Sequence, residues 1–151
     1  MDLKCFFRLA FLLVALPAFS LTDLHVGDKV SADAEKVEGA LILSSPSQFW
    51  PLWKWTQNGE EYSLGVNKEG IVKFISLDSP LACTEENIRL GDKYSDVKKS
   101  VKIEREFFLP GWAWCVVLPS GWILAFPETD FDSKTQGINN EATVFMIFKG
   151  E

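Results

Sequence analysis

The chain has 151 residues, a formal net charge of −6 and a hydrophobic content of 47%. That length and apolar content suffice for one globular domain with a real core. The acidic balance argues against nucleic acid or anionic lipid headgroups as partners, and suits either a basic partner or simply solubility.

The first twenty residues are organised like a secretory signal peptide. Lys4 and Arg8 introduce the short apolar run Leu9–Phe19, and Ala18 and Ser20 are small residues ahead of the expected cleavage site after Ser20. An uncleaved anchor is the alternative, but the run is short for a membrane span. Cleavage leaves 131 residues with a net charge of −7. We therefore expect a periplasmic or secreted protein without a stable membrane anchor.

Two segments 64 residues apart resemble each other. The stretch LHVGDKVS at Leu24–Ser31 reappears as IRLGDKYS at Ile88–Ser95, and five of fourteen positions are identical when the comparison runs to Val37 and Val101. A repeat at about half the mature chain indicates a duplication. We predict one continuous domain over residues 21–151, with repeat unit 1 at residues 21–80 and repeat unit 2 at residues 81–151.

Each unit is predicted to form a helix directly after its Gly-Asp-Lys motif. Hydrophobic residues recur there at spacings of three and four, which places them on one helical face. These residues are Val30, Ala34 and Val37 in unit 1, and Tyr94, Val97 and Val101 in unit 2. The next stretch of unit 1, Glu38–Trp50, stays open between a helical extension and another strand.

Three strands are predicted to follow each helix. In unit 1, Asn58-Gly59 is a strong hairpin signal, and Asn67–Gly70 makes a second turn. The predicted strands are Trp53–Thr56, Glu61–Val66 and Ile71–Leu77, and in unit 2 Trp112–Leu118, Trp122–Phe126 and Thr143–Lys149. The expected fold is α+β: two tandem helix–β-meander repeats form one antiparallel sheet of about six strands, with the helices packed on one face.

A family resemblance follows from this arrangement. Ile88–Gly91 with Val97, followed by a meander, resembles the small lipoprotein of the outer-membrane β-barrel assembly machine. Two such units in tandem in an exported chain with a disulfide resemble the β-lactamase inhibitor protein family. The similarity in letters covers about fourteen residues per unit. The resemblance implies a concave sheet that binds another protein and performs no chemistry.

Two cysteines remain after the signal peptide is removed. Cys83 and Cys115 of an exported chain are expected to form a disulfide, with two free buried thiols as the alternative. The bond would bring Cys115 to the helix side of the sheet. Because strand residues alternate between faces, Trp112 and Trp114 would then lie on the uncovered face.

Aromatic residues therefore provide the predicted partner-binding face. Repeat register adds further tryptophans from unit 1, and a neighbouring strand adds two more aromatics. The alternative is that these rings fill the core. A second candidate is the acidic loop beginning at Glu128, which is either a basic-cleft binder or a plain solvated loop. The predicted binding residues are Trp53, Trp55, Trp112, Trp114, Trp122, Phe126, Asp130, Phe131 and Asp132.

No catalytic constellation stands out in the sequence. His25 is the only histidine, no Gly-x-Ser-x-Gly elbow is present, and a zinc site would need three or four convergent ligands. We therefore expect no enzymatic activity, no cofactor and no metal. The predicted function is an exported protein-binding module, an inhibitor or immunity-type protein with a possibly basic partner. The alternatives are an envelope assembly or scaffolding factor and an aromatic platform for a glycan or peptidoglycan fragment. The oligomeric state stays open.

Overall fold

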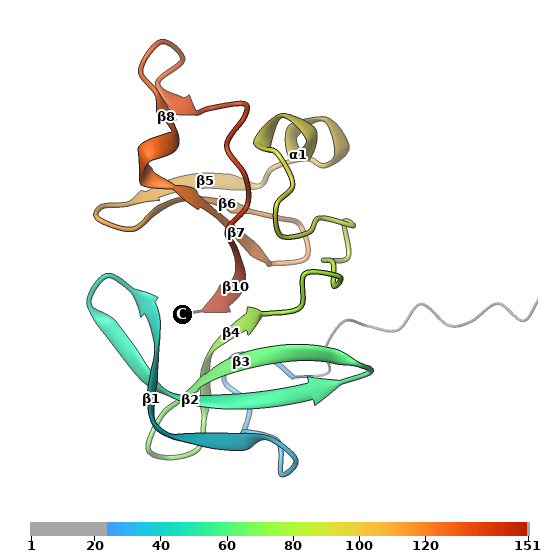
Figure 1. Cartoon of the computed structure of the whole chain (residues 1–151), viewed down its shortest axis with the longest axis vertical. Coiled ribbons are helices and arrows are strands. Elements are labelled where there is room, and N and C mark those ends of the chain that lie inside the picture. The colour runs from blue at the N-terminus through green and yellow to red at the C-terminus, as the bar shows by residue number, and fades with distance from the viewer. Residues whose placement is uncertain (1–23, 151) are drawn as a thin grey trace, which may run out of the picture.

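A computed structural model describes residues 24–150, which form one strongly curved antiparallel sheet of eight strands (Figure 1). The strand order is β1-β2-β3-β4-β10-β7-β6-β5. The strands are β1 (Glu35–Ser45), β2 (Gln48–Gln57), β3 (Glu60–Val66), β4 (Val72–Leu77), β5 (Arg105–Leu109), β6 (Ala113–Val117), β7 (Ile123–Pro127) and β10 (Met146–Gly150). A short 3-10 helix, η1 (Glu128–Asp130), and a small hairpin of β8 (Phe131–Asp132) and β9 (Gly137–Ile138) stand beside the sheet.

The predicted α+β class is wrong, because the described chain is mostly β with a single α-helix, α1 (Tyr94–Ser100). The helix expected over Val30–Val37 is absent. Unit 1 has no room for it: Gly27 lies eight positions before β1 begins, whereas Gly91 lies fourteen positions before β5 begins. The first residues of β1 instead pair with β2, and the unassigned stretch Glu38–Trp50 forms the rest of β1 and the start of β2.

The tight turns follow the sequence closely. Asn58 and Gly59 both have positive φ, 52° and 81°, as the hairpin between β2 and β3 requires. The turn at Asn67–Gly70 leads into β4, and the turn at Pro119–Gly121 joins β6 to β7. The predicted signal peptide lies outside the described residues. In residues 24–150 no helix has the length and apolar character needed to cross a membrane.

The two Gly-Asp-Lys motifs occupy equivalent places in the sheet. The amide of each motif's glycine donates to a carbonyl at 2.8 Å, and the carbonyl of each motif's aspartate accepts from the same residue at 2.9 Å. That partner residue is Val72 for Gly27 and Asp28, and Val144 for Gly91 and Asp92.

These equivalences define a pseudo-twofold axis through the centre of the sheet. Ser76 lies four residues after Val72, Phe148 lies four residues after Val144, and Ser76 and Phe148 are direct partners in the β4–β10 pair. Figure 1 shows the half with β1–β4 in cool colours meeting the other half in warm colours at this pair. Counted outward from the axis, the strands of each half follow in reverse chain order: β4, β3, β2 and β1 on one side, and β10, β7, β6 and β5 on the other.

The core lies on the face of the sheet that α1 covers, which we call the α1 face. Tyr62, Leu64, Leu124 and Phe126 are fully buried there, and Val97 of α1 packs into the same cluster. The opposite face carries a smaller buried cluster with a half-buried rim and no helix over it in the described chain. Its buried members are Phe74, Ala113, Cys115, Ala125 and Phe148.

The predicted Cys83–Cys115 disulfide is absent, and both cysteines are free. Cys115 is buried on the opposite face. Cys83 lies between Ala82 and Thr84, which are both buried, and Ala82 belongs to the core of the α1 face. The expectation placed Cys115 and Trp114 on the wrong faces. The alternation of β6 is as expected, but its phase is inverted, because Trp114 and Val116 provide the packing against the α1-face core.

Candidate functional site

Two aromatic clefts flank the segment that follows β7. The first has a volume of about 350 Å³ and is lined by Phe108, Trp114, Glu128 and Phe131. The second has a volume of about 380 Å³ and is lined by Trp112, Pro127, Glu128, Thr129 and Phe145. Glu128 lines both, while Trp114 packs on the α1 face and Trp112 on the opposite face, and we call the two clefts together the aromatic site.

A stack of three rings forms the first cleft. The alternation of β6 places Trp114 on the α1 face, and its ring centroid lies 4.6 Å from that of Phe108 on β5. Pro127 ends β7, and η1 then carries the chain back so that Phe131 stacks on Trp114 at 5.4 Å, with only 9° between the ring planes. Phe131 remains 43% exposed. The cleft therefore offers an ordered aromatic surface to solvent.

The second cleft lies where β6 begins. Trp112 follows the Pro110-Gly111 turn and tilts onto Phe148 at a centroid distance of 5.5 Å. Phe145 is held by its amide, which donates to the carbonyl of Ala125 at 3.0 Å, and its side chain is 42% exposed. Together with Phe131, Phe145 gives the aromatic site two large apolar side chains that the described fold leaves partly uncovered.

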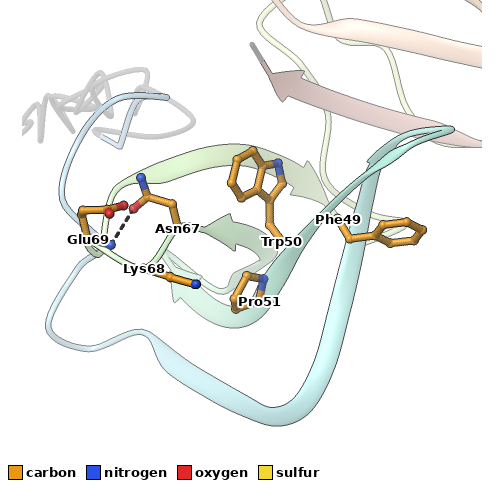
Figure 2. Close-up of a pocket in the computed structure, with 6 residues that line it drawn as sticks. All are labelled: Phe49, Trp50, Pro51, Asn67, Lys68 and Glu69. Atoms are coloured by element: carbon orange, nitrogen blue, oxygen red, sulfur yellow. Dashed lines mark hydrogen bonds between the residues drawn. The ribbon is translucent and has the colours of Figure 1, made fainter.

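A third cleft, of about 360 Å³, lies in the other half of the molecule (Figure 2). Residues Phe49–Pro51 of β2 form one wall, and the Asn67–Glu69 turn after β3 forms the other. The Asn67 side-chain oxygen shapes this turn by accepting from the amides of Glu69 and Ile71 at 3.1 and 2.8 Å.

The pseudo-twofold axis relates this third cleft to the aromatic site. Strand pairing makes Ser63 equivalent to Ile123 and Lys54 equivalent to Val117, because each pair occupies the same positions relative to the axis. Counting along the strands then matches Phe49–Pro51 with Trp112–Trp114 and Asn67–Glu69 with Pro127–Thr129. Lys68 stands where the aromatic site has Glu128, so the charge is reversed at equivalent positions.

The structure divides the predicted binding residues. Trp55, Trp122 and Phe126 are buried in the core, and Trp53 is half-buried against it, so none of the four forms an open aromatic face. The predicted register between the two repeats was also wrong. Trp53 pairs with Leu64, and the equivalent of Leu64 in the other half, Leu124, pairs with Val116. Trp53 is therefore equivalent to Val116 and not to a tryptophan.

The remaining predicted residues gather near the aromatic site. Trp112, Trp114 and Phe131 line its clefts, and Asp130 ends η1 immediately before Phe131. Asp132 accepts from the amide of Lys134 at 2.9 Å and so helps to turn the β8–β9 hairpin. The stretch predicted as a long open loop is therefore partly ordered. Sequence reasoning missed Phe108 and Phe145, although two adjacent phenylalanines at Phe107-Phe108 were a signal.

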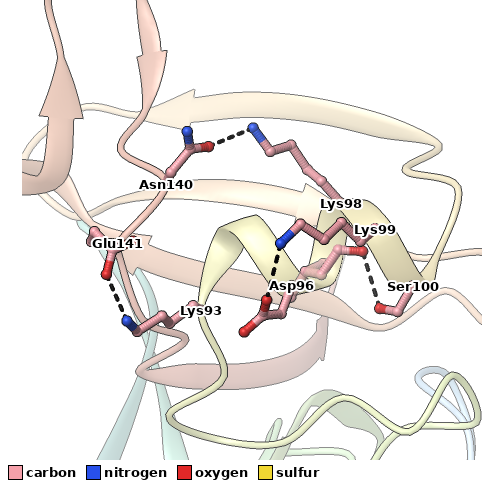
Figure 3. Close-up of polar contacts among 8 residues, drawn as sticks. Lys93, Asp96, Lys98, Lys99, Ser100, Asn140 and Glu141 are labelled. Atoms are coloured by element: carbon pink, nitrogen blue, oxygen red, sulfur yellow. Dashed lines mark hydrogen bonds and ion pairs between the residues drawn. The ribbon is translucent and has the colours of Figure 1, made fainter.

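Polar contacts tie the far end of this stretch to α1 (Figure 3). Glu141 pairs with Lys93 at 2.6 Å, and this contact raises the pKa of Lys93 and lowers the pKa of Glu141. Lys98 donates to Asn140 at 2.7 Å, and Lys99 faces Asp96 at 3.7 Å. Lys93 and Lys98 thus connect the region of α1 to the chain before β10, whereas Lys99 pairs within α1.

No protein-family model, curated protein or solved structure matches this chain. The resemblance to the β-lactamase inhibitor protein family therefore stays a prediction. Within residues 24–150, no three histidine, cysteine or acidic side chains are grouped to hold a metal ion.

Proposed function

We propose that this chain is an exported, non-enzymatic inhibitor or immunity-type protein that binds a partner protein through the aromatic site. The supporting observation is that two aromatic clefts share Glu128 and that each is lined by a partly exposed phenylalanine, Phe131 in the first and Phe145 in the second. Aromatic anchors in clefts dominate the energetics of protein interfaces.

Charge supports a basic partner. The chain carries a net charge of −6, and the aromatic site has Glu128 at its centre with Asp130 and Asp132 next to it in the chain. Complementary charge speeds encounter and suppresses wrong partners. We therefore propose a partner that presents apolar side chains surrounded by lysine or arginine.

Affinity capture from a periplasmic extract tests this proposal. The mature chain and its Phe131→Ala and Phe145→Ala variants serve as baits, and mass spectrometry identifies the captured proteins. The matched control is Leu81→Ala, because Leu81 is 79% exposed and lines neither cleft. We expect a captured protein whose affinity falls by about 30-fold or more in the cleft variants, as hot-spot residues require, and is unchanged in the control. Equal capture by all baits would exclude the aromatic site.

A second candidate is a sugar ring. The first cleft is near the lower size limit of small-ligand sites, and its stacked rings could hold a flat saccharide face. Ionic strength separates the two candidates: binding of a basic protein should weaken steeply between low and high salt, whereas glycan stacking should not change.

A further inference from the structure

Strand β5 is an edge strand of the sheet, and its residue Phe108 lines the first cleft. It pairs with β6 on one side and is the last strand of the sheet on the other. All five of its residues pair with β6 in one unbroken register, from Arg105 opposite Val117 to Leu109 opposite Ala113. Alternate amide and carbonyl groups of such an edge point away from the sheet, where they can pair with another strand.

The other edge of the sheet is built differently. The register of β1 is interrupted between Lys36 and Leu41 and again between Leu43 and Ser45. Gly39, inside the first interruption, has a φ of +73°. Bulges of this kind twist an edge and oppose further pairing. Of the two edges, β5 is therefore the one shaped to accept a strand.

The side chains of β5 continue apolar surface on both faces. Phe107 and Leu109 pack at the rim of the cluster on the opposite face, whereas Phe108 lines the first cleft on the α1 face. A strand added beside β5 would place alternate side chains next to these two surfaces. Backbone pairing at the edge and side-chain burial at the first cleft would then belong to one binding event.

We propose that β5 receives an extended, positively charged segment of the partner protein as a ninth strand of the sheet. This inference rests on the proposed function, because it specifies how the partner reaches the aromatic site. The charge of the occupant follows from the surroundings: Glu104 and Glu106 flank the exposed Arg105, and Glu128 lies at the cleft. A second copy of the mature chain is a poor occupant, since each copy carries a net charge of −7 and β5 is only five residues long.

Hydrogen–deuterium exchange with defined peptides tests the inference. The probe is a nine-residue synthetic peptide of alternating lysine and valine, and the matched control is the same peptide with alternate N-methyl groups, which removes backbone donors and keeps the side chains. With the full mature chain, we expect the probe to slow exchange of the β5 amides by about threefold or more, as new backbone pairing protects them. The control peptide should leave β5 unchanged, and neither peptide should protect β1.

Two further variants sharpen the result. Glu128→Lys should raise the peptide concentration needed for protection by about tenfold, and the exposed Leu81→Ala should have no effect. Unchanged β5 exchange at about 1 mM probe, a concentration far above the dissociation constant expected of an added strand, would overturn the inference, as would equal protection by the N-methylated peptide.

The proposed function is tested separately: if Phe131→Ala abolishes partner capture while β5 exchange never changes, the aromatic site binds a partner but no strand is added. If instead the peptide protects β5 but capture of a protein does not depend on the clefts, then β5 accepts a strand and the aromatic site does not bind the partner.

Discussion

Gly65 shows how closely neighbouring side chains approach the sheet. A Cβ at this position would lie 2.9 Å from the Cβ of Trp50 and 3.0 Å from the Cβ of Phe74. Both neighbours are attached to strands of the same sheet, so neither can move away freely. The indole nitrogen of Trp50 also donates to the Ser44 hydroxyl at 3.1 Å, which holds the ring in place over β3.

We expect Gly65→Ala to lower the free energy of unfolding by about 1–3 kcal/mol, because the added methyl group overpacks a fixed site. Gly137→Ala is the control: its φ is not in the left-handed region, and the nearest atom to the new Cβ would be 4.0 Å away. Urea denaturation followed by tryptophan fluorescence measures both. Equal stability of the two variants would contradict the close approach of Trp50.

The two thiols make a second prediction at this scale. Burial raises the pKa of Cys115 to about 12, whereas Cys83 is half-buried. At pH 8, Ellman's reagent should modify Cys83 in the folded protein and reach Cys115 only after unfolding, because the thiolate is the reactive form. A protein of residues 21–151 purified under non-reducing conditions should have two free thiols. If no free thiol is detected, the disulfide predicted from the sequence is present.

The same burial makes stability depend on pH. The folded-state pKa of Cys115 lies above its ordinary value of 9.0, so its contribution to stability is fully present below that pH and is lost as pH rises toward 12. Burial also raises the pKa of Tyr62 to about 12, which acts in the same direction. The free energy of unfolding in urea should therefore fall between about pH 9 and 12. A flat profile over that range would be inconsistent with burial of both groups.

At the scale of elements, features set by neighbouring residues could be predicted from the sequence, whereas features set by pairing between separate strands could not. The Asn58-Gly59 hairpin depends on two adjacent residues that favour positive φ, so the sequence alone predicts it. Helix α1 was predicted from Tyr94 and Val97, whose side chains are indeed buried on one face. The same spacing in unit 1 failed because β2 captures Glu35 and Lys36 as strand partners.

The candidate site shows the same limit. Trp112, Trp114 and Phe131 could be singled out as aromatic residues, but only the fold shows that Phe131 returns over Trp114. Trp122 and Phe126 looked equally suitable in the sequence and are core residues. Periodicity of two defines which residues share a face of a strand, yet it does not say which face is covered.

The two Gly-Asp-Lys motifs predict matched losses. Asp28 accepts from the amide of His25 and Asp92 from the amide of Arg89, each at 2.8 Å. Replacing either aspartate with alanine should lower the free energy of unfolding by about 1–2 kcal/mol, because a charged acceptor is lost from a turn. Thermal and urea unfolding of both single variants provide the comparison.

The control for this pair is Asp96→Ala, since the exposed Asp96 carboxylate faces the exposed Lys99 at 3.7 Å. Its effect should be close to zero. The double variant Asp28→Ala/Asp92→Ala should lose about the sum of the two single losses, because independent sites add. Losses that differ several-fold between the two motifs would show that the motifs are not equivalent.

At the scale of the whole molecule, one core serves both halves. Tyr62 and Leu64 from β3 belong to the same buried cluster as Leu124 from β7 and Val97 from α1. The central β4–β10 pair joins the halves through backbone hydrogen bonds as well. Neither half can therefore complete its core or its central strand pairing alone.

The intact chain should unfold in a single cooperative transition, with coincident urea curves from fluorescence and circular dichroism. A fragment of residues 21–80 should lack ordered β structure, because β4 loses its partner β10 and the apolar cluster loses its second half. Circular dichroism of the fragment and of a mixture with residues 81–151 measures this. A fragment that is folded by itself would contradict the shared core.

The two halves of the sheet, which meet where Ser76 pairs with Phe148, can acquire different residues at equivalent positions. In an assembly of two identical subunits, any change at one end appears at the other end as well. Here a peptide link joins the halves, so a single codon change alters one end only. Lys68 and Glu128, at matching positions with opposite charge, are an example of that independence.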